Sequence, residues 1–285
     1  MTFPAPLRST GARAAYALGV GALLVVWMLP LLGVAITSLR PEEALARGEV
    51  WAWPRELAWD NYATVFRTSH IGRLIANSFA VTLASVAGAL ACATLAGHAL
   101  AKHDFRGRHL LLAIFVGGNL VPFQTLMLPV RDLMLALGLY DTRWALIVFH
   151  VAFQTGFCTL FMRNFIRALP DELLEAARLE GASEWAVLRH VVLPLVRPAL
   201  AGVAVLVFTF VWNDYFWSLV LVQSEDVRPL TAGLQTLRGM WQTSWSLVSA
   251  ASIVAALAPV TMFFLMQQHL IAGLTYGARR DTDRA

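Results

Sequence analysis

Charged residues are scarce in this chain of 285 residues. Asp, Glu, Lys and Arg make up 14% of it, whereas roughly 25% is usual for a soluble globular protein. Apolar residues make up 58%, and the mean hydropathy is +0.62. Such a composition excludes an ordinary soluble domain and favours a chain that lies within a membrane.

Cysteine is also scarce, and the usual metal-ligand patterns are missing. Cys92 and Cys158 each lie in an apolar stretch, where cysteine behaves as a small buried hydrophobic residue. A structural zinc site needs about four ligands at paired spacings, and the seven histidines are scattered without an H-E-x-x-H pattern. The sequence therefore predicts no metal site in this chain.

Motifs for nucleotide and nucleic-acid binding are missing as well. No G-x-x-x-x-G-K-[ST] loop for ATP occurs in the chain, so any ATP and Mg²⁺ that drive it must bind another polypeptide. The net charge is +4, but the arginines lie mostly at the ends of apolar runs rather than on one basic helix. We therefore expect no nucleic-acid partner.

Six apolar segments are each long enough for a helix that crosses a bilayer. Backbone groups in lipid must be hydrogen-bonded internally, so these segments are helices rather than strands. The first is too long for a signal peptide, and we expect it to be retained. We predict an all-α membrane protein with one transmembrane domain over residues 1–285 and spans at about Ala14–Leu39, Asn77–Ala101, Leu110–Val130, Trp144–Phe165, Ala199–Val222 and Leu247–Leu270.

The distribution of basic residues predicts the orientation. The short connection Lys102–Arg108 carries three basic residues, which is typical of a cytoplasmic loop. Both termini are then cytoplasmic, and the protein is a multi-pass component of a bacterial inner membrane. The long connection Arg40–Ala76 lies outside, and its aromatic residues either anchor it at the membrane interface or form a surface for a solute or partner. These aromatic residues are Trp51, Trp53, Trp59 and Tyr62.

One connection, at about residues 169–194, has the pattern of a structured loop, and we call it the EAA segment. A short helix is predicted after Pro170, which suits the first helical turn, and Gly181 is expected to end it in the left-handed conformation. A second helix is predicted from a Ser183 cap to about Val192, ending before Pro194. Its apolar stripe would lie on the membrane surface; the stripe consists of Trp185, Leu188 and Val192.

The EAA segment resembles a signature of importer permeases. Glu175, Ala176 and Ala177 are followed after three residues by Gly181 and then, nine residues later, by Val191-Val192-Leu193-Pro194. This matches the E-A-A-x₃-G-x₉-I-x-L-P loop of permease subunits in ATP-binding-cassette (ABC) importers, with Val191 in place of Ile.

Other segments resemble the carbohydrate-uptake branch of that family, the maltose-permease (MalG-like) subunits. His98 departs from the pattern, since the family usually has Tyr there. The similar segments are Asn77-Ser78, Gly97–Lys102, Pro122–Pro129, Leu137–Thr142, Trp212-Asn213-Asp214 and Gln267–Gly277.

The resemblance implies a type I ABC importer fold and a coupling role for the EAA segment. A cytoplasmic coupling helix would dock into a cleft of an ATPase subunit, and closure of two ATPase copies on ATP would move the spans. The implied partners are those two ATPase copies, a second homologous permease subunit and an extracytoplasmic solute-binding protein. The coupling residues carried over are Glu175, Ala176, Ala177, Gly181, Leu193 and Pro194.

Polar residues within the spans are candidates for the translocation path. Amides offer a donor and an acceptor together, which suits hydroxyl-rich solutes, but they also bond helix to helix. Asp214 either caps a break in span five or lines the path, and Pro122 and Pro129 are both expected to break span three. The candidates are Asn119, Gln124, Gln154, Asn213 and Asp214.

The expected function is ATP-driven import of a sugar or sugar-like solute, a mono- or oligosaccharide or a polyol, by a subunit that is not itself an enzyme. Glycerol 3-phosphate is an alternative solute, although a phosphate would want convergent arginines within the spans. An ion-coupled secondary transporter is a further alternative, but no acid–base relay or inverted repeat supports it. A membrane enzyme would need a nucleophile–base pair or a metal cluster.

Overall fold

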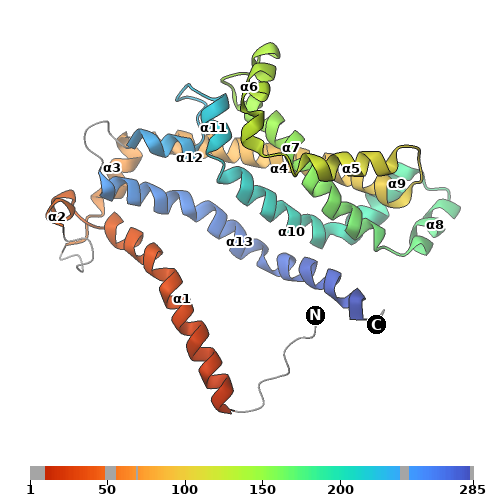
Figure 1. Ribbon diagram of the computed structural model, residues 1–285, viewed down its shortest axis with the longest axis horizontal. Coiled ribbons are helices and arrows are strands. Elements are labelled where there is room, and N and C mark those ends of the chain that lie inside the picture. The colour runs from red at the N-terminus through yellow and green to blue at the C-terminus, as the bar shows by residue number, and fades with distance from the viewer. Residues whose placement is uncertain (1–9, 49–55, 69, 238–243, 283–285) are drawn as a thin grey trace. The chain divides into compact units, whose positions relative to one another are not determined.

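The structure is a computed structural model that describes residues 10–48, 56–68, 70–237 and 244–282, and within these ranges all regular elements are helices (Figure 1). The chain divides into two compact units. The first comprises Met1–His70 and Thr236–Val254, and the second comprises Ile71–Gln235 and Ala255–Ala285.

The first unit contains α1 (Thr10–Ser38), α2 (Glu42–Ala46), α3 (Asp60–Thr68) and the start of α13 (Trp245–Thr282). The last carbonyls of a helix lack intrahelical partners, and α3 supplies them for α1. Asn61 Nδ2 donates to the carbonyl oxygens of Ser38 and Arg40 at 2.9 and 2.8 Å. The Tyr62 hydroxyl lies 2.8 Å from Ser38 Oγ, so α1 and α3 are joined by side-chain hydrogen bonds.

Glu42 fastens α2 to the first turn of α13. Its carboxylate accepts hydrogen bonds from the Ser244 hydroxyl at 2.7 Å and from the Ser246 backbone N–H at 3.3 Å. A negative charge at a helix N-terminus is favourable because the unpaired N–H groups there carry partial positive charge. Burial alone would raise the pKa of Glu42, but these hydrogen bonds outweigh it and hold the pKa below its usual value.

The second unit is a helical bundle built around α4 (Ile71–Lys102), α7 (Arg143–Arg167) and α10 (Leu193–Trp212), and it also contains the rest of α13. Its core is formed where apolar faces of these three helices meet. The shorter elements are α5 (Arg108–Gly118), η1 (Phe123–Leu126), α6 (Met127–Ala136), α8 (Asp171–Leu179), α9 (Glu184–Val187), the π turn η2 (Leu188–Val192), α11 (Phe216–Leu221), α12 (Leu230–Gly233) and η3 (Leu234–Leu237).

Glycines on α4 allow α7 to approach its backbone closely. A Cβ atom on Gly97 would lie 2.9 Å from the backbone nitrogen of Arg163 and 3.1 Å from Met162 Cβ. A Cβ on Gly88 would lie 2.6 Å from Val151 Cγ2. Small residues at such crossings let packing between helices replace the hydrophobic effect, which does not drive association in lipid. Helices α4 and α7 are therefore in close contact at two positions, Gly88 and Gly97.

The predicted spans are confirmed as helices, with differences in their limits. Among the described residues, five helices are long and apolar enough to cross a membrane, and the bent pair Arg108–Gly118 and Phe123–Ala136 makes a sixth if it is counted as one span. The pair is bent by 97° at its break. The second, fourth and sixth spans extend beyond the predicted limits at both ends, and α13 reaches Thr282 rather than Leu270. The first helix begins earlier than predicted and ends at Ser38. The prediction of one helix over Ala199–Val222 is wrong, because α10 ends at Trp212 and α11 begins at Phe216 after a break.

Pro122, but not Pro129, lies at the break in span three. Pro122 directly precedes η1, whereas Pro129 lies within the first turn of α6. The first turn has no hydrogen bond for a proline to remove, so the helix continues through it. The prediction of a second break at Pro129 is therefore wrong.

The helix after Ser183 also continues where an end was predicted. The chain is helical from Glu184 to Trp212, passing through Pro194 and Pro198. The π turn Leu188–Val192 ends two residues before Pro194, and such a wider turn leaves room for the Pro194 ring that an α-turn would not. Leu188 and Val192 are buried in the protein core, so the predicted membrane-surface stripe is wrong as well.

The connection predicted over Arg40–Ala76 contains α2, α3 and the first turn of α4. Asn77 is therefore not the start of the second span. Its amide donates to the carbonyl oxygens of Asp226 and Arg228 at 2.8 and 3.0 Å, which ties α4 to the segment before α12. Trp59 is exposed, while Trp51 and Trp53 lie outside the described residues.

Gly97→Ala should destabilise the full chain in detergent by about 1–3 kcal/mol, because the added methyl must displace the backbone of α7. Gly72→Ala is the matched control on the same helix, since a Cβ there meets nothing within 4 Å. It should be neutral or stabilising, as alanine has the higher helix propensity. Thermal unfolding of both variants tests this, and equal shifts would contradict the close-packing account.

Candidate functional site

The EAA segment forms two helices joined by a tight turn. The first, α8 (Asp171–Leu179), begins directly after Pro170, whose backbone is extended at ψ 133°. Pro170 thus occupies the N-cap position rather than the predicted first helical turn. Asp171 and Glu172 in the first turn complement the positive end of the helix dipole. The segment therefore begins as local chemistry predicts, displaced by one residue.

Gly181 ends α8 in the left-handed conformation that the sequence predicts. Its φ is +87°. The Gly181 N–H donates to the carbonyl of Arg178 at 3.0 Å, and the Ala182 N–H donates to that of Ala177 at 3.0 Å. This pair of bonds is a Schellman motif, which satisfies the last carbonyls of a helix and reverses the chain. Ser183 then caps α9, accepting from the Ala186 N–H at 3.3 Å, so that predicted cap is confirmed.

One face of α8 is left open by the described residues of its own unit. Leu174 is 1% exposed and anchors the helix, whereas Glu175 and Ala176 are exposed and Ala177 is half-buried. Leu179 is 89% exposed, so a partner that covered this face would bury a large apolar side chain. Leu193 and Pro194 lie apart from this face, in the first turn of α10.

Lys102, at the end of α4, holds the start of the EAA segment. Its Nζ donates to the Leu169 carbonyl at 2.7 Å and to Asp171 Oδ1 at 2.6 Å. The lysine side chain is only 6% exposed, so its charge is compensated by these two partners. The same hydrogen bond and charge lower the pKa of Asp171. The junction of α7 and α8 is therefore tied to the neighbouring span.

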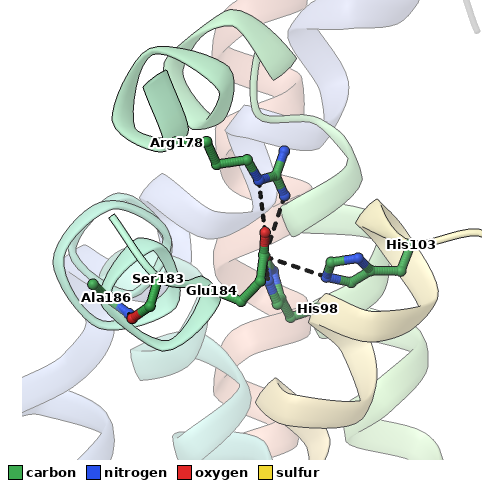
Figure 2. Close-up of polar contacts among 6 residues, drawn as sticks. All are labelled: His98, His103, Arg178, Ser183, Glu184 and Ala186. Atoms are coloured by element: carbon green, nitrogen blue, oxygen red, sulfur yellow. Dashed lines mark hydrogen bonds and ion pairs between the residues drawn. The ribbon is translucent and has the colours of Figure 1, made fainter. Parts of the chain in front are cut away.

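Arg178 and Glu184 close the turn between α8 and α9. Arg178 Nε donates to Glu184 Oε1 at 2.7 Å and Nη2 donates to Oε2 at 3.2 Å, which raises the pKa of Arg178. Figure 2 shows Arg178 on one side of this carboxylate and the imidazoles of His98 and His103 on the other. Sequence reasoning missed this cluster because its members lie on three separate elements.

The polar residues predicted for the translocation path gather at two breaks in the helices. Asn119 and Gln124 flank the break in span three, and both are exposed. Asn213 follows the last residue of α10. The Phe123 and Phe216 rings, one beside each break, lie 5.6 Å apart between centroids. The two breaks are therefore neighbours within this unit.

Helix α7 borders both breaks. Asn119 Nδ2 would lie 3.1 Å from a Cβ on Gly156, and its amide donates to the Phe115 carbonyl at 2.6 Å. His150 Nε2 lies 3.5 Å from Asp214 Oδ2. Gln154, between those α7 positions, is 8% exposed. The predicted path residues therefore belong to one region, although Gln154 faces the interior more than the others.

Asp214 caps α11. Its carboxylate accepts hydrogen bonds from the N–H groups of Trp217 and Ser218 at 3.2 and 3.1 Å, as expected for an acidic residue that precedes a helix. Asn213 donates to the Thr209 carbonyl at 2.9 Å. Of the two roles predicted for Asp214, the structure displays the cap, and a role in the path stays a prediction.

A family model described as the binding-protein-dependent transport system inner membrane component matches residues 71–276. This chain belongs to that family. It is an ABC transporter permease subunit, and the match includes the EAA segment and both helix breaks.

Curated relatives agree with the family. The chain is 35% identical over 260 residues to the osmoprotective compounds uptake permease protein GgtD of Synechocystis, covering 89% of this chain and 87% of the relative. It is 31% identical over 263 residues to the arabinooligosaccharides transport system permease protein AraQ of Halalkalibacterium halodurans, covering 91% and 94%.

A solved structure agrees in fold. A chain from a bacterial ABC transporter involved in the import of the acidic polysaccharide alginate has a TM-score of 0.79 and 25% sequence identity, with 93% of this chain and 99% of that chain covered. The predicted importer permease fold is therefore confirmed for this member of the family.

Gly181→Val should abolish transport, because a β-branched residue is strained at this positive φ. A Cβ at Gly181 meets nothing within 4 Å, so the variant should still insert and fold. Gly181→Asn is the matched control, since asparagine tolerates the left-handed conformation and should retain more transport. Uptake in membrane vesicles, normalised to the amount of inserted protein, measures both. Normal uptake by Gly181→Val would contradict the role of the turn.

Proposed function

We propose that this chain is one of two permease subunits through which a neutral sugar or polyol enters the cell, driven by ATP hydrolysis on separate subunits. A relative whose name assigns it to arabino-oligosaccharides and another assigned to osmoprotective compounds support a hydroxyl-rich solute. The family description, with its binding-protein-dependent system, supports an extracytoplasmic protein that delivers the solute.

The open face of α8 carries this proposal. Leu179 and Ala176 are exposed on this face, together with one charged residue, Glu175. Because the alanine side chain is small, another subunit can approach the α8 backbone closely. Leu179 would be removed from water when a partner covers this face, which favours binding. With both termini in the cytoplasm, α8 faces the compartment that holds ATP, and two copies of an ATP-binding subunit would serve the two permeases.

The EAA segment is connected so that a movement at α8 reaches the membrane helices. Arg178 joins α8 to the first residue of α9, and from Glu184 the helix is continuous for 29 residues to Trp212. That helix ends at the Asn213–Tyr215 break, beside the break in span three. A rotation of α8 would therefore act on the region of the predicted path, as in rigid-body switching.

The chemistry of the breaks favours an uncharged, hydroxyl-rich solute. Asn119, Gln124 and Asn213 are amides, which can donate to and accept from hydroxyl groups. Broken helices place free backbone groups beside them, as in other transporters. A glycerol phosphate would want an arginine among these residues, and the described residues of the two breaks, 119–124 and 213–215, include none.

The test is ATP-driven uptake by the purified complex. The tagged chain should copurify in mild detergent with a second permease and an ATP-binding subunit. In proteoliposomes, the binding protein loaded with an arabino-oligosaccharide, a disaccharide or a polyol should stimulate ATP hydrolysis, whereas glycerol 3-phosphate should not. A chain that purifies alone, or uptake driven by a proton gradient without ATP, would contradict the proposal.

A further inference from the structure

Two imidazoles and one carboxylate converge beside the EAA segment. His98 lies on the last turns of α4, His103 directly follows that helix, and Glu184 is the first residue of α9. Glu184 Oε2 lies 3.5 Å from His103 Nε2 and 3.9 Å from His98 Nε2. One ligand atom from each residue lies within 4.8 Å of the other two. Figure 2 shows all three side chains directed toward a common point.

His98 lacks the partners that a buried imidazole needs. Its side chain is 8% exposed, and neither ring nitrogen has a hydrogen-bond partner among the residues that the structure describes. A buried polar group without a partner costs about 1–3 kcal/mol, and such groups in native proteins point to an ion or water that completes them. The His103 ring stands edge-on to it, at 5.4 Å between centroids and 86° between planes, which leaves the Nε2 atoms free to share a ligand.

We propose that His98, His103 and Glu184 form a binding site for a transition-metal dication, with Zn²⁺ the best fit. Imidazole and carboxylate are ligands that zinc accepts, whereas Ca²⁺ and Mg²⁺ prefer all-oxygen sites. Tetrahedral bonds of about 2.0–2.2 Å place ligand atoms roughly 3.3–3.5 Å apart. The two carboxylate–imidazole separations, 3.5 and 3.9 Å, are close to this range, and the ligand nitrogens of the two imidazoles lie within 4.8 Å of each other. Side-chain rotations would bring the three ligand atoms together, and water would fill the fourth position.

Arg178 holds the Glu184 carboxylate in position, but its positive charge lowers the expected affinity for a metal ion. Its Nε bond to Glu184 Oε1 can remain when the metal binds Oε2, which would hold the carboxylate as outer-shell partners do in metal sites. Its Nη2 bond to Oε2, at 3.2 Å, would share that oxygen with the metal. The adjacent positive charge weakens the attraction for a dication, so the affinity should be lower than that of a four-ligand structural zinc site.

Metal bound here would clamp the EAA segment to the end of α4. Glu184 begins the helix that leads to the Asn213 break, and His98 and His103 belong to the span that Lys102 already ties to α8. A third cross-link would oppose rotation of the segment, so zinc should inhibit transport. This consequence rests on the proposed coupling role, whereas metal binding itself does not.

Binding is tested on the full chain, purified in detergent with a tag free of histidine and stripped with a chelator. Titration with Co²⁺, followed by its visible absorption, and displacement by Zn²⁺ should give one site per chain. His103→Ala and Glu184→Gln should each weaken binding at least about tenfold. His109→Ala, an exposed histidine on α5, is the matched control and should bind as the native chain does.

The two kinds of measurement distinguish metal binding at the three residues from an effect of that metal on transport. Binding that His103→Ala and Glu184→Gln leave unchanged, or no binding by the native chain at micromolar metal, would overturn the site. Because Glu184 also pairs with Arg178, thermal unfolding is measured for each variant. If Glu184→Gln does not fold, metal binding by His103→Ala alone tests the site. In proteoliposomes, zinc should inhibit native uptake strongly and His103→Ala uptake weakly, each relative to its own metal-free rate. Equal inhibition would overturn the clamp while leaving the binding result intact.

Discussion

The close approach of α4 to α7 is the constraint on which the rest of the second unit depends. In lipid, helices gain little by hiding apolar surface, so contact between backbones and small residues must hold them together. Gly88 and Gly97 provide this contact, the latter against the backbone of Arg163. Because Gly97 lies one turn before the end of α4, the same crossing places Lys102 beside the end of α7. The anchoring of the EAA segment is thus a consequence of glycine packing within the bundle.

Hydrogen bonds and an ion pair hold the EAA segment in one conformation, while one face of α8 is exposed. A Schellman turn, the Arg178–Glu184 pair and the Lys102 bonds fix its shape from within, while Leu179 remains 89% exposed. A stiff element can transmit a displacement without absorbing it, and the continuous helix from Glu184 extends that stiffness to the Asn213 break. In the proposed coupling role, a movement of α8 would therefore reach the Asn213 break through this helix.

Local chemistry allowed the sequence to predict what depends on a few neighbouring residues. Gly181 ended α8 and Ser183 capped α9 as expected, because each is decided within one turn. The predicted helix end before Pro194 is wrong because the five-residue π turn Leu188–Val192 removes the clash that proline usually causes. The cluster of His98, His103 and Glu184 could not be predicted, since only the folded bundle brings such distant residues together. The sequence indicates the break at Pro122 and offers a cap at a break in span five as one role for Asp214, and the hydrogen bonds from Trp217 and Ser218 to its carboxylate display that cap.

The central claim is that the open face of α8 is the docking surface for an ATP-binding subunit. The most direct measurement attaches a photoactivatable thiol reagent to Leu179→Cys in the assembled complex. Exposed Cys92 is replaced by serine, and Cys158 is buried. We predict a cross-link to the ATP-binding subunit whose yield changes with ATP, and none from Glu225→Cys, an exposed position in the connection between α11 and α12. A cross-link from Glu225→Cys alone, or labelling of Leu179→Cys by lipid only, would contradict the claim.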